Sequence, residues 1–223
     1  MKKIIQLTDD GSQTINVAET NITYHSTYGA IQESMHVFIN AGLHSLLNTK
    51  NELHVFEMGF GTGLNPLLTL QEAIQHKQKI HYTTIDLFPL DKEIYEQLDY
   101  ATQLNNRELQ PYFSKLHSCN WEEDIYIDPL FTFHKSITSL IDFSTSKQFD
   151  LIYFDAFEPA VQPELWTEKI FHKLFSLLLP NGVLTTYSSK GNVRRAMQAA
   201  GFTVQKLKGA ARKREMVRAV KKV

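Results

Sequence analysis

The chain has 223 residues, of which 43% are hydrophobic and 11% aromatic. This suffices for one α/β core and is short for two independent domains. Cys119 is the single cysteine, which excludes an internal disulfide. No stretch approaches the roughly 18 consecutive apolar residues of a membrane span. No apolar run of signal-peptide length follows the start, so the sequence predicts a cytoplasmic protein.

The net charge of −1 conceals a strong asymmetry along the chain. Residues 190–223 hold eleven Lys and Arg residues and one acid, Glu215, which gives a formal charge of +10. The first 189 residues hold the other 12 basic and 23 acidic residues and carry −11. Such polarity predicts a basic surface near the C-terminus that faces an acidic partner. The alternative is a solvated basic edge on the last strands.

Apolar periodicity and turn signals predict an α/β alternation along the chain. The N-terminal elements are a hairpin, 3–7 and 13–18, and a helix over about 26–47. The later predicted strands are 53–58, 79–86, 130–133, 149–154, 182–187, 202–206 and 215–220. The later predicted helices are 65–76, 91–98, 166–178 and 192–200, with helix plus loop over 100–129.

This order predicts a Rossmann-like, doubly wound and mostly parallel sheet that ends in an antiparallel hairpin. We expect residues 1–50 to form an N-terminal hairpin and helix extension. Residues 51–223 would then form the core of one compact domain.

The sharpest motif is Glu57-Met58-Gly59-Phe60-Gly61-Thr62-Gly63, between a predicted strand and a predicted helix. Ligands of open α/β sheets bind at the carboxyl ends of strands, where glycines permit a tight turn and close approach. The charge of Glu57 is unfavourable beside the pyrophosphate of a dinucleotide but suits the ammonium of a methionine moiety. Asp86 ends the next strand and is placed to accept both hydroxyls of a ribose. The pattern favours S-adenosylmethionine; a nucleotide phosphate and a glycine turn without a ligand are the alternatives.

A third strand-end acid, Asp155, follows the predicted strand 149–154. It would lie on the same sheet edge as Glu57 and Asp86. There it could hold or deprotonate an acceptor amine beside the sulfonium methyl; capping the next helix is the alternative. Glu158, one turn further on, is a second and less specific candidate.

With these motifs in place, the sequence resembles the methyltransferase half of the bifunctional tRNA 5-methylaminomethyl-2-thiouridine biosynthesis protein. The similar segments span about residues 24–219, nearly the whole chain. They are Ser26–Ser34 with His36-Val37-Phe38, Phe56–Asn65, Tyr82–Asp86 with Phe88-Pro89-Leu90, Asp155–Pro159 with Pro163–Thr167, and Val193-Arg194-Arg195 through Ala200-Gly201-Phe202 to Lys213–Met216.

The resemblance implies S-adenosylmethionine-dependent methylation of the primary amine of an aminomethyl group on a tRNA wobble uridine. It implies that Asp155 is the essential acid. The expected cofactor-binding residues are Glu57, Gly59, Phe60, Gly61, Gly63 and Asp86.

The tRNA would be held through its phosphates by the basic C-terminal residues. These are Arg194, Arg195, Lys208, Arg212, Lys213 and Arg214. A flipped base also needs an aromatic or apolar slot. The candidates for this slot are Phe60, Phe157, Trp166 and Tyr187, each of which could equally belong to the core.

Two departures from the family pattern affect these expectations. The family's FAD-dependent oxidase half, which makes the amine, is missing from the 223 residues. We therefore expect a separate oxidase or another source of the amine. Many related methyltransferases also carry an acid after the third strand that binds the adenine amino group. Here the segment is Phe133-His134-Lys135-Ser136, so the adenine contact stays unassigned.

Three other functions fit parts of the sequence. One is methylation of a small-molecule amine, and another is aminopropyl transfer, which uses the same fold and an acid after the fourth strand. The third is a non-catalytic RNA-binding module. The nine histidines are scattered without metal-ligand spacing, so the sequence predicts no metal site.

Overall fold

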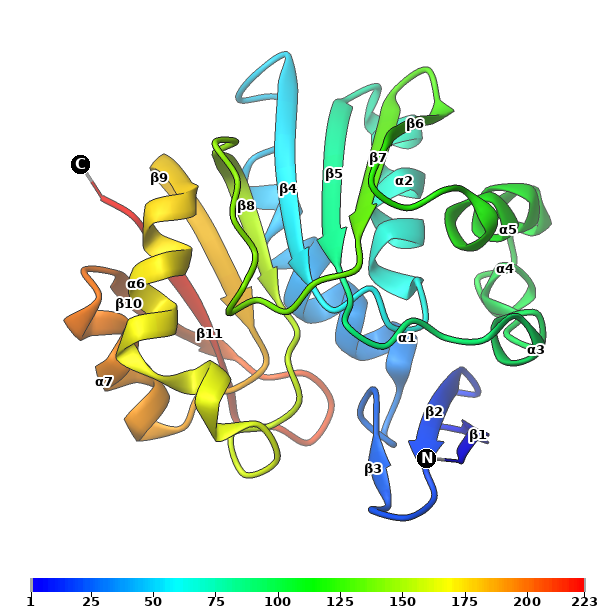
Figure 1. Cartoon of the computed structure of the whole chain (residues 1–223), viewed down its shortest axis with the longest axis horizontal. Helices are drawn as coiled ribbons and strands as arrows, with labels where there is room; N and C mark the ends of the chain where they lie inside the picture. The colour runs from blue at the N-terminus through cyan, green and yellow to red at the C-terminus, as the bar shows by residue number, and fades with distance from the viewer. Residues whose placement is uncertain (1, 223) are drawn as a thin grey trace.

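The computed structural model describes residues 2–222, which form two β-sheets flanked by helices (Figure 1). The larger sheet has eight strands in the order β10-β11-β9-β8-β4-β5-β7-β6. Its strands are β4 Glu52–Met58, β5 Lys79–Ile85, β6 Asp124–Asp128, β7 Phe131–Ser136, β8 Phe149–Phe154, β9 Leu178–Thr186, β10 Thr203–Lys208 and β11 Glu215–Val220. The smaller sheet contains β1 Lys3–Leu7, β2 Gln13–Val17 and β3 Ile22–Thr23.

Five adjacent strands, β9, β8, β4, β5 and β7, run parallel in the centre of the large sheet. Every residue of β8 is buried, as expected for a strand covered on both faces. Successive side chains alternate between the two faces, so Val55 belongs to one hydrophobic cluster and Phe56 to the other. The expected Rossmann-like α/β fold is therefore confirmed.

Different helices cover the two faces of the sheet (Figure 1). Helix α2, Leu64–His76, packs with the N-terminal helical segment on the face that contains Val55. Helices α6, Glu168–Leu177, and α7, Gly191–Ala199, pack on the opposite face. The remaining helices are α3 Lys92–Tyr95, α4 Tyr100–Gln103 and α5 Gln110–Ser118, with short 3₁₀ turns at Arg107–Leu109 and Pro163–Trp166.

The single helix expected over residues 26–47 is wrong, because the structure divides this segment into three parts. They are α1 Ala30–Ser34, a π-helix Met35–Asn40 and a 3₁₀ turn Leu43–Ser45. The wider π turn closes with a bond from Ala41 N to His36 O at 3.3 Å. Val37, Phe38 and Ile39 are consecutive and all buried. Tertiary packing on several sides thus replaces the one-sided burial of a regular amphipathic helix.

Other differences concern the edges of predicted elements. Residues 100–129 also contain strand β6, which pairs antiparallel with β7. The helix expected over 91–98 is reduced to α3, and β3 was not expected. Strand β9 begins at Leu178 rather than at the predicted residue 182, so Pro180-Asn181-Gly182 lies within the strand. The pairing register of β8 and β9 shifts there, which accommodates Asn181 with its φ of 64°.

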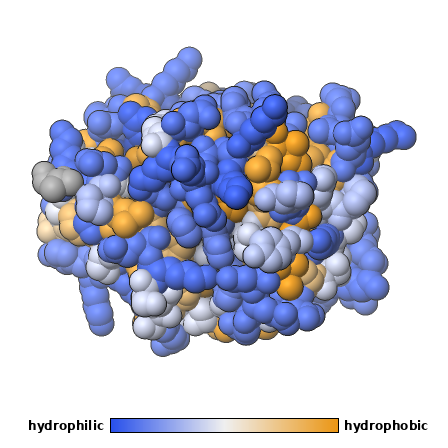
Figure 2. Space-filling view, turned by 90° about the horizontal axis from the view of Figure 1, so that it is seen from above, coloured by the Kyte–Doolittle hydropathy of each residue, from blue (hydrophilic) through white to orange (hydrophobic). Residues whose placement is uncertain are grey.

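The C-terminal hairpin β10–β11 is antiparallel, as expected, and β11 also pairs antiparallel with β9. The small sheet lies below the carboxyl ends of β4 and β5 in Figure 1. Figure 2 views the opposite side, at the amino ends of the parallel strands, where hydrophobic side chains form small groups among hydrophilic ones. Within residues 2–222, no helix combines the length and apolar character needed to cross a membrane.

Candidate functional site

Two adjoining cavities open at the carboxyl ends of the parallel strands. The first has a volume of about 280 Å³ and is bounded by the glycine turn after β4, the end of β5 and the segment 138–141. The second has a volume of about 650 Å³ and extends toward the C-terminal basic residues. Both are lined by Tyr24, His25 and the segment Asp155-Ala156-Phe157. The structure therefore brings the predicted turn, Asp86 and Asp155 to one site.

The turn between β4 and α2 depends on backbone conformations that favour glycine. Gly59, Gly61 and Gly63 have φ values of 92°, 52° and 74°. A Cβ on Gly61 would lie 3.5 Å from the Tyr24 ring, which also lines the first cavity. The turn thus leaves room between its backbone and Tyr24 that a larger residue would reduce.

Asp86 lines the first cavity and accepts hydrogen bonds from two backbone amides beside it. Its Oδ2 accepts a hydrogen bond from Gly61 N at 2.9 Å, and its Oδ1 accepts one from Phe88 N at 2.8 Å. The carboxylate is thereby fixed at the end of β5, next to the glycine turn. Each carboxylate oxygen has more than one lone pair, so both can still accept hydroxyl donors.

Glu57 occupies a different place from the one its charge suggests. Its side chain is 1% exposed and lies behind the turn, where Oε2 accepts a hydrogen bond from Thr84 Oγ1 at 2.9 Å. Burial raises the pKa of this carboxyl well above its ordinary value. Glu57 is not among the residues that line either cavity. In this arrangement it supports the turn from within the sheet.

The other two predicted turn residues differ in their surroundings. Phe60 lines the first cavity, and its ring packs against His117 and Phe133 with centroid separations of 4.8 and 5.8 Å. Gly63 precedes α2, and a Cβ there would lie 2.8 Å from His117 Nε2. Burial lowers the pKa of His117 to about 3, so this imidazole is neutral. Gly63 therefore serves the packing of α2.

The segment Phe133–Ser136, which was expected to lack an adenine-binding acid, lies within β7, and the residues after this strand form a neutral wall of the first cavity. Lys135 points away from it, is fully buried, and donates to Leu116 O at 2.9 Å and His117 O at 2.6 Å. The cavity wall beyond β7 is formed by Thr138, Ser139, Leu140 and Ile141.

Asp155 stands at the junction of the two cavities. It follows β8 directly, and its Oδ2 accepts a hydrogen bond from Asn65 Nδ2 at 3.0 Å. Burial and the nearby Glu33 carboxylate raise the pKa of Asp155 to about 7, although the Asn65 hydrogen bond and the Lys213 ammonium act in the opposite direction. This carboxyl can therefore gain or lose a proton near neutral pH.

An ion pair between the buried Glu33 and the half-exposed Lys213 lies beside Asp155 in the second cavity. Lys213 Nζ contacts Glu33 Oε1 and lies 4.3 Å from the centroid of the Tyr187 ring. The Tyr187 hydroxyl donates to Ala156 O at 2.9 Å, which holds the ring beside the loop after β8. Ser188 also lines this cavity, and its buried Oγ has no hydrogen-bond partner within the described residues.

The other predicted basic residues lie around the second cavity or near it. Arg214 lines the cavity, and Arg212 is exposed with its guanidinium 4.8 Å from the Tyr28 ring. Arg194 and Arg195 are the fourth and fifth residues of α7; Arg194 is half-buried and Arg195 is exposed. Lys213 differs from them because its ammonium is already paired with Glu33.

The aromatic candidates divide into cavity-lining and core residues. Phe157 lines both cavities, and Tyr187 lines the second. Trp166 is buried, and its Nε1 donates to Phe157 O at 2.8 Å, so it supports the loop from the core. Glu158 is exposed at the second cavity, 3.4 Å from Lys190 Nζ.

Several residues at this site were missed from the sequence. They are Tyr24, His25, Glu33, Asn65 and Ser188. Tyr24, His25 and Glu33 come from the N-terminal extension, whose position over the sheet edge follows from tertiary packing. Asn65 belongs to the predicted Phe56–Asn65 motif, which was the available signal for it.

Comparison with known proteins supports the same class of site. The sequence model of a family described as S-adenosyl-L-methionine-dependent methyltransferase matches residues 99–222. The crystal structure of MNMC2 from Aquifex aeolicus is similar with a TM-score of 0.80 and 21% sequence identity, over 100% of this chain and 71% of that chain. Spermidine synthase from Thermotoga maritima is similar with a TM-score of 0.50 and 17% identity, over 98% of this chain and 69% of that chain.

At these identities the two solved structures support the fold, whereas the family match covers more than half of the chain, including Asp155 and the basic C-terminal residues. The cofactor of the family also agrees with the arrangement of acids and glycines around the first cavity. The chain belongs to the family of S-adenosyl-L-methionine-dependent methyltransferases.

Proposed function

We propose that this methyltransferase methylates the primary amine of an aminomethyl group on the wobble uridine of tRNA. The observation that carries the proposal is the position of Asp155 between the two cavities. An acid there can contact an amine that enters from the second cavity while the cofactor occupies the first. The resemblance to the methyltransferase half of the tRNA 5-methylaminomethyl-2-thiouridine biosynthesis protein supplies the identity of the acceptor.

The first cavity fits S-adenosylmethionine in its chemistry. Asp86 would accept the ribose hydroxyls, and the backbone of Gly59, Phe60 and Gly61 would approach the rest of the cofactor closely. Glu57 and Gly63 would act by holding the turn in shape. The adenine would lie toward residues 138–141, where backbone groups and the hydroxyls of Thr138 and Ser139 replace the missing acid.

Methyl transfer requires a neutral amine beside an electrophilic methyl group. S-adenosylmethionine supplies this methyl group when it is bound. An alkylammonium ion has no lone pair and cannot attack. The carboxylate of Asp155, with its pKa of about 7, can accept the ammonium proton and orient the amine. Asn65 fixes that carboxylate through its amide, so the acceptor meets a positioned group.

The second cavity fits an extruded base with phosphates around its opening. Phe157 and Tyr187 offer aromatic surface for the base. The exposed cations at or near the rim would contact the tRNA backbone. They are Lys190, Arg195, Arg212 and Arg214, with the half-buried Arg194 next to Arg195 on α7.

Mass spectrometry of wobble nucleosides tests this function in cells. In a strain that lacks the gene, the wobble position should carry aminomethyl-uridine in place of methylaminomethyl-uridine. A plasmid copy of the wild-type chain should restore methylaminomethyl-uridine. An Asp155→Asn copy, expressed at the same level, should not. Unchanged wobble nucleosides in the deletion strain would reject the tRNA substrate.

The amine substrate needs a source, and we propose that an FAD-dependent oxidase supplies it. If such an oxidase works upstream, its loss should leave carboxymethylaminomethyl-uridine in tRNA. Accumulation of this precursor separates a missing amine from a failure of methyl transfer. The cytoplasm, where tRNA is modified, stays the predicted location.

A further inference from the structure

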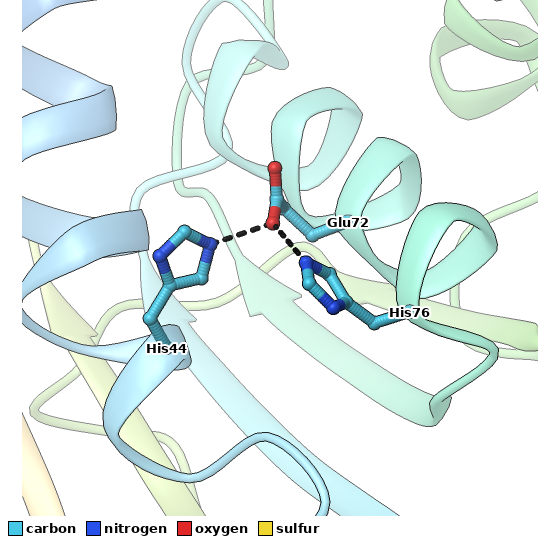
Figure 3. A group of neighbouring side chains, drawn as sticks. All are labelled: His44, Glu72 and His76. Carbon is cyan, nitrogen blue, oxygen red and sulfur yellow. Dashed lines mark hydrogen bonds and ion pairs between the residues drawn. The ribbon is translucent and has the colours of Figure 1, made fainter.

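Three potential metal ligands, none of which lines either of the two cavities, lie close together (Figure 3). His44 comes from the 3₁₀ turn Leu43–Ser45, and Glu72 and His76 are one turn apart on α2. Glu72 Oε2 lies 2.6 Å from His44 Nε2 and 3.3 Å from His76 Nε2. One potential ligand atom from each residue lies within 4.8 Å of the others. The sequence did not reveal this group because His44 is 28 residues away from Glu72.

The electrostatics of the group are unusual for a buried carboxylate. The Glu72 side chain is only 10% exposed, and within residues 2–222 no Lys or Arg nitrogen lies within 4.0 Å of its oxygens. Asp124 provides a contrast, since it contacts His81 and His134 but also Lys147.

We propose that His44, Glu72 and His76 bind one divalent transition-metal ion, with Zn²⁺ as the best-fitting ion. Two imidazole nitrogens and one carboxylate oxygen form a common zinc ligand set, with bonds of about 2.0–2.2 Å. The imidazoles are 36% and 34% exposed, so water can reach the ion and complete a four-coordinate shell. Entry of the ion replaces the hydrogen bond between His44 and Glu72 with two metal bonds.

The position of the group indicates a structural role for the ion. Helix α2 begins beside the glycine turn at Leu64, and its Glu72 and His76 lie in the last half of the helix, away from the methyl-transfer site. Coordination would join the N-terminal extension, through His44, to the helix that follows the cofactor turn. An ion bound only by the folded chain raises its stability by mass action.

Calorimetric titration of the metal-free chain with ZnCl₂ tests the proposal, together with thermal melts. We expect one tight site per chain and a rise in Tm of about 5–10 °C at a hundredfold excess of Zn²⁺ over Kd. Mg²⁺, which prefers oxygen ligands, should produce no comparable rise. Absence of a stoichiometric Zn²⁺ site in the wild-type chain would overturn the proposal.

Variants identify the ligands. His44→Gln and His76→Gln should each weaken Zn²⁺ binding at least tenfold and remove most of the metal-dependent rise in Tm. His172→Gln is the matched control, because His172 forms an i,i+4 pair with Glu168 at 3.4 Å without being part of a three-ligand group. Comparing each variant with and without Zn²⁺ separates metal binding from any intrinsic loss of stability. Equal Zn²⁺ affinity in His44→Gln, His76→Gln and His172→Gln would assign the ion elsewhere.

Discussion

Asp155 illustrates how a single side chain acquires a role from its surroundings. The carboxyl is ordinary in sequence, but the end of β8 places it between two cavities and beside Glu33 and Lys213. Burial and the like charge of Glu33 hold its pKa near 7. A carboxyl with this pKa can accept a proton from an ammonium ion more readily than a surface aspartate can.

Replacement of Asp155 by Asn should remove this proton acceptor while keeping the size of the side chain. We expect methyl transfer to fall by roughly 10²-fold or more, with cofactor affinity retained. Single-turnover rates and calorimetry measure the two properties separately. Asp91→Asn is a suitable control, because Asp91 is an exposed aspartate outside both cavities. Turnover near the wild-type value in a folded Asp155→Asn protein would remove Asp155 from the chemistry.

The two charged neighbours of Asp155 should shift its titration in opposite directions. Protonation of Asp155 as the pH falls through about 7 should lower the rate at saturating substrates. Glu33→Gln removes a like charge and should move this decline to lower pH. Lys213→Met removes an opposite charge and should move it to higher pH. Two variant profiles that shift in the same direction, or not at all, would show that Asp155 is not the titrating group.

At the residue scale, the sequence was sufficient where a motif coincides with a strand end. Asp86 and Asp155 were predicted at the sheet edge, and the structure places both in the cavity walls. The charge of Glu57 was informative, but its burial behind the turn depends on neighbours such as Thr84. The pairing of Glu33 with Lys213 joins residues 180 positions apart, so no local pattern reveals it.

At the scale of elements, the N-terminal hairpin caps a helix that is distant in the sequence. Helix α1 has Gly29 at its N-cap, which has no side chain to offer. Ser12 Oγ instead accepts hydrogen bonds from Ala30 N and Ile31 N at 3.0 and 3.2 Å. Asp10 Oδ2 accepts one from Gln32 N at 3.0 Å. The hairpin therefore supplies the missing cap and fixes the start of the segment that contributes Glu33.

Asp10→Asn should weaken this connection. The carboxyl is exposed, so we expect a loss of about 1 kcal/mol in the free energy of unfolding at pH 7, measured by urea denaturation. Burial opposes ionisation of Asp10, but hydrogen bonds from Ser12, Gln32 and Thr8 outweigh it and lower its pKa below 3.8. The stabilisation by ionised Asp10 is thus present above pH 3.8 and lost as the pH falls through the lowered value.

The difference between wild type and Asp10→Asn should accordingly shrink in acid. Asp9→Asn provides the control, because the adjacent Asp9 is also exposed and its side chain makes no hydrogen bond within the described residues. A difference that stays constant between pH 7 and pH 3 would contradict the assignment of a charged cap.

Helices and strands were predictable where the pattern of buried residues follows the period of the element. Strands β8 and β11 were predicted with the bounds that the structure has, because each is a short, mostly apolar run with polar or charged residues on both sides. The segment 26–47 failed because Met35–Asn40 is buried on several sides and adopts a π-helix. Strand β6 was missed because its alternation is short and because it lies at the edge of the large sheet, beside β7.

At the scale of the whole molecule, the basic residues are concentrated in the last part of the chain, and several of them lie together around the second cavity. The C-terminal basic segment returns to the edge of the second cavity through Lys213 and Arg214, and α7 brings Arg194 and Arg195 nearby. This arrangement was predicted only as a basic surface near the C-terminus. The sequence could not show that the surface adjoins the cavity that holds Asp155.

Salt dependence of tRNA binding tests this arrangement. Each phosphate contact removed should lower the magnitude of the log Kd against log salt slope by roughly 0.7–0.9. We therefore expect a reduction of about 2–3 for the triple variant Arg195→Ala, Arg212→Ala, Arg214→Ala. The control replaces three exposed lysines outside the cavities, Lys77, Lys79 and Lys169, with Ala. Equal slopes for the two triple variants would show that the C-terminal cations are solvated and do not contact tRNA phosphates.

The most direct measurement of the proposed reaction is nucleoside mass spectrometry after incubation of the purified chain with S-adenosylmethionine and tRNA. Two tRNA preparations are compared, one with aminomethyl-uridine at the wobble position and one with unmodified uridine there. We predict conversion of aminomethyl-uridine to methylaminomethyl-uridine, with a mass increase of about 14 Da for one methyl group, and no product from the unmodified tRNA. Absence of this product, or transfer of an aminopropyl group instead, would contradict the proposed function.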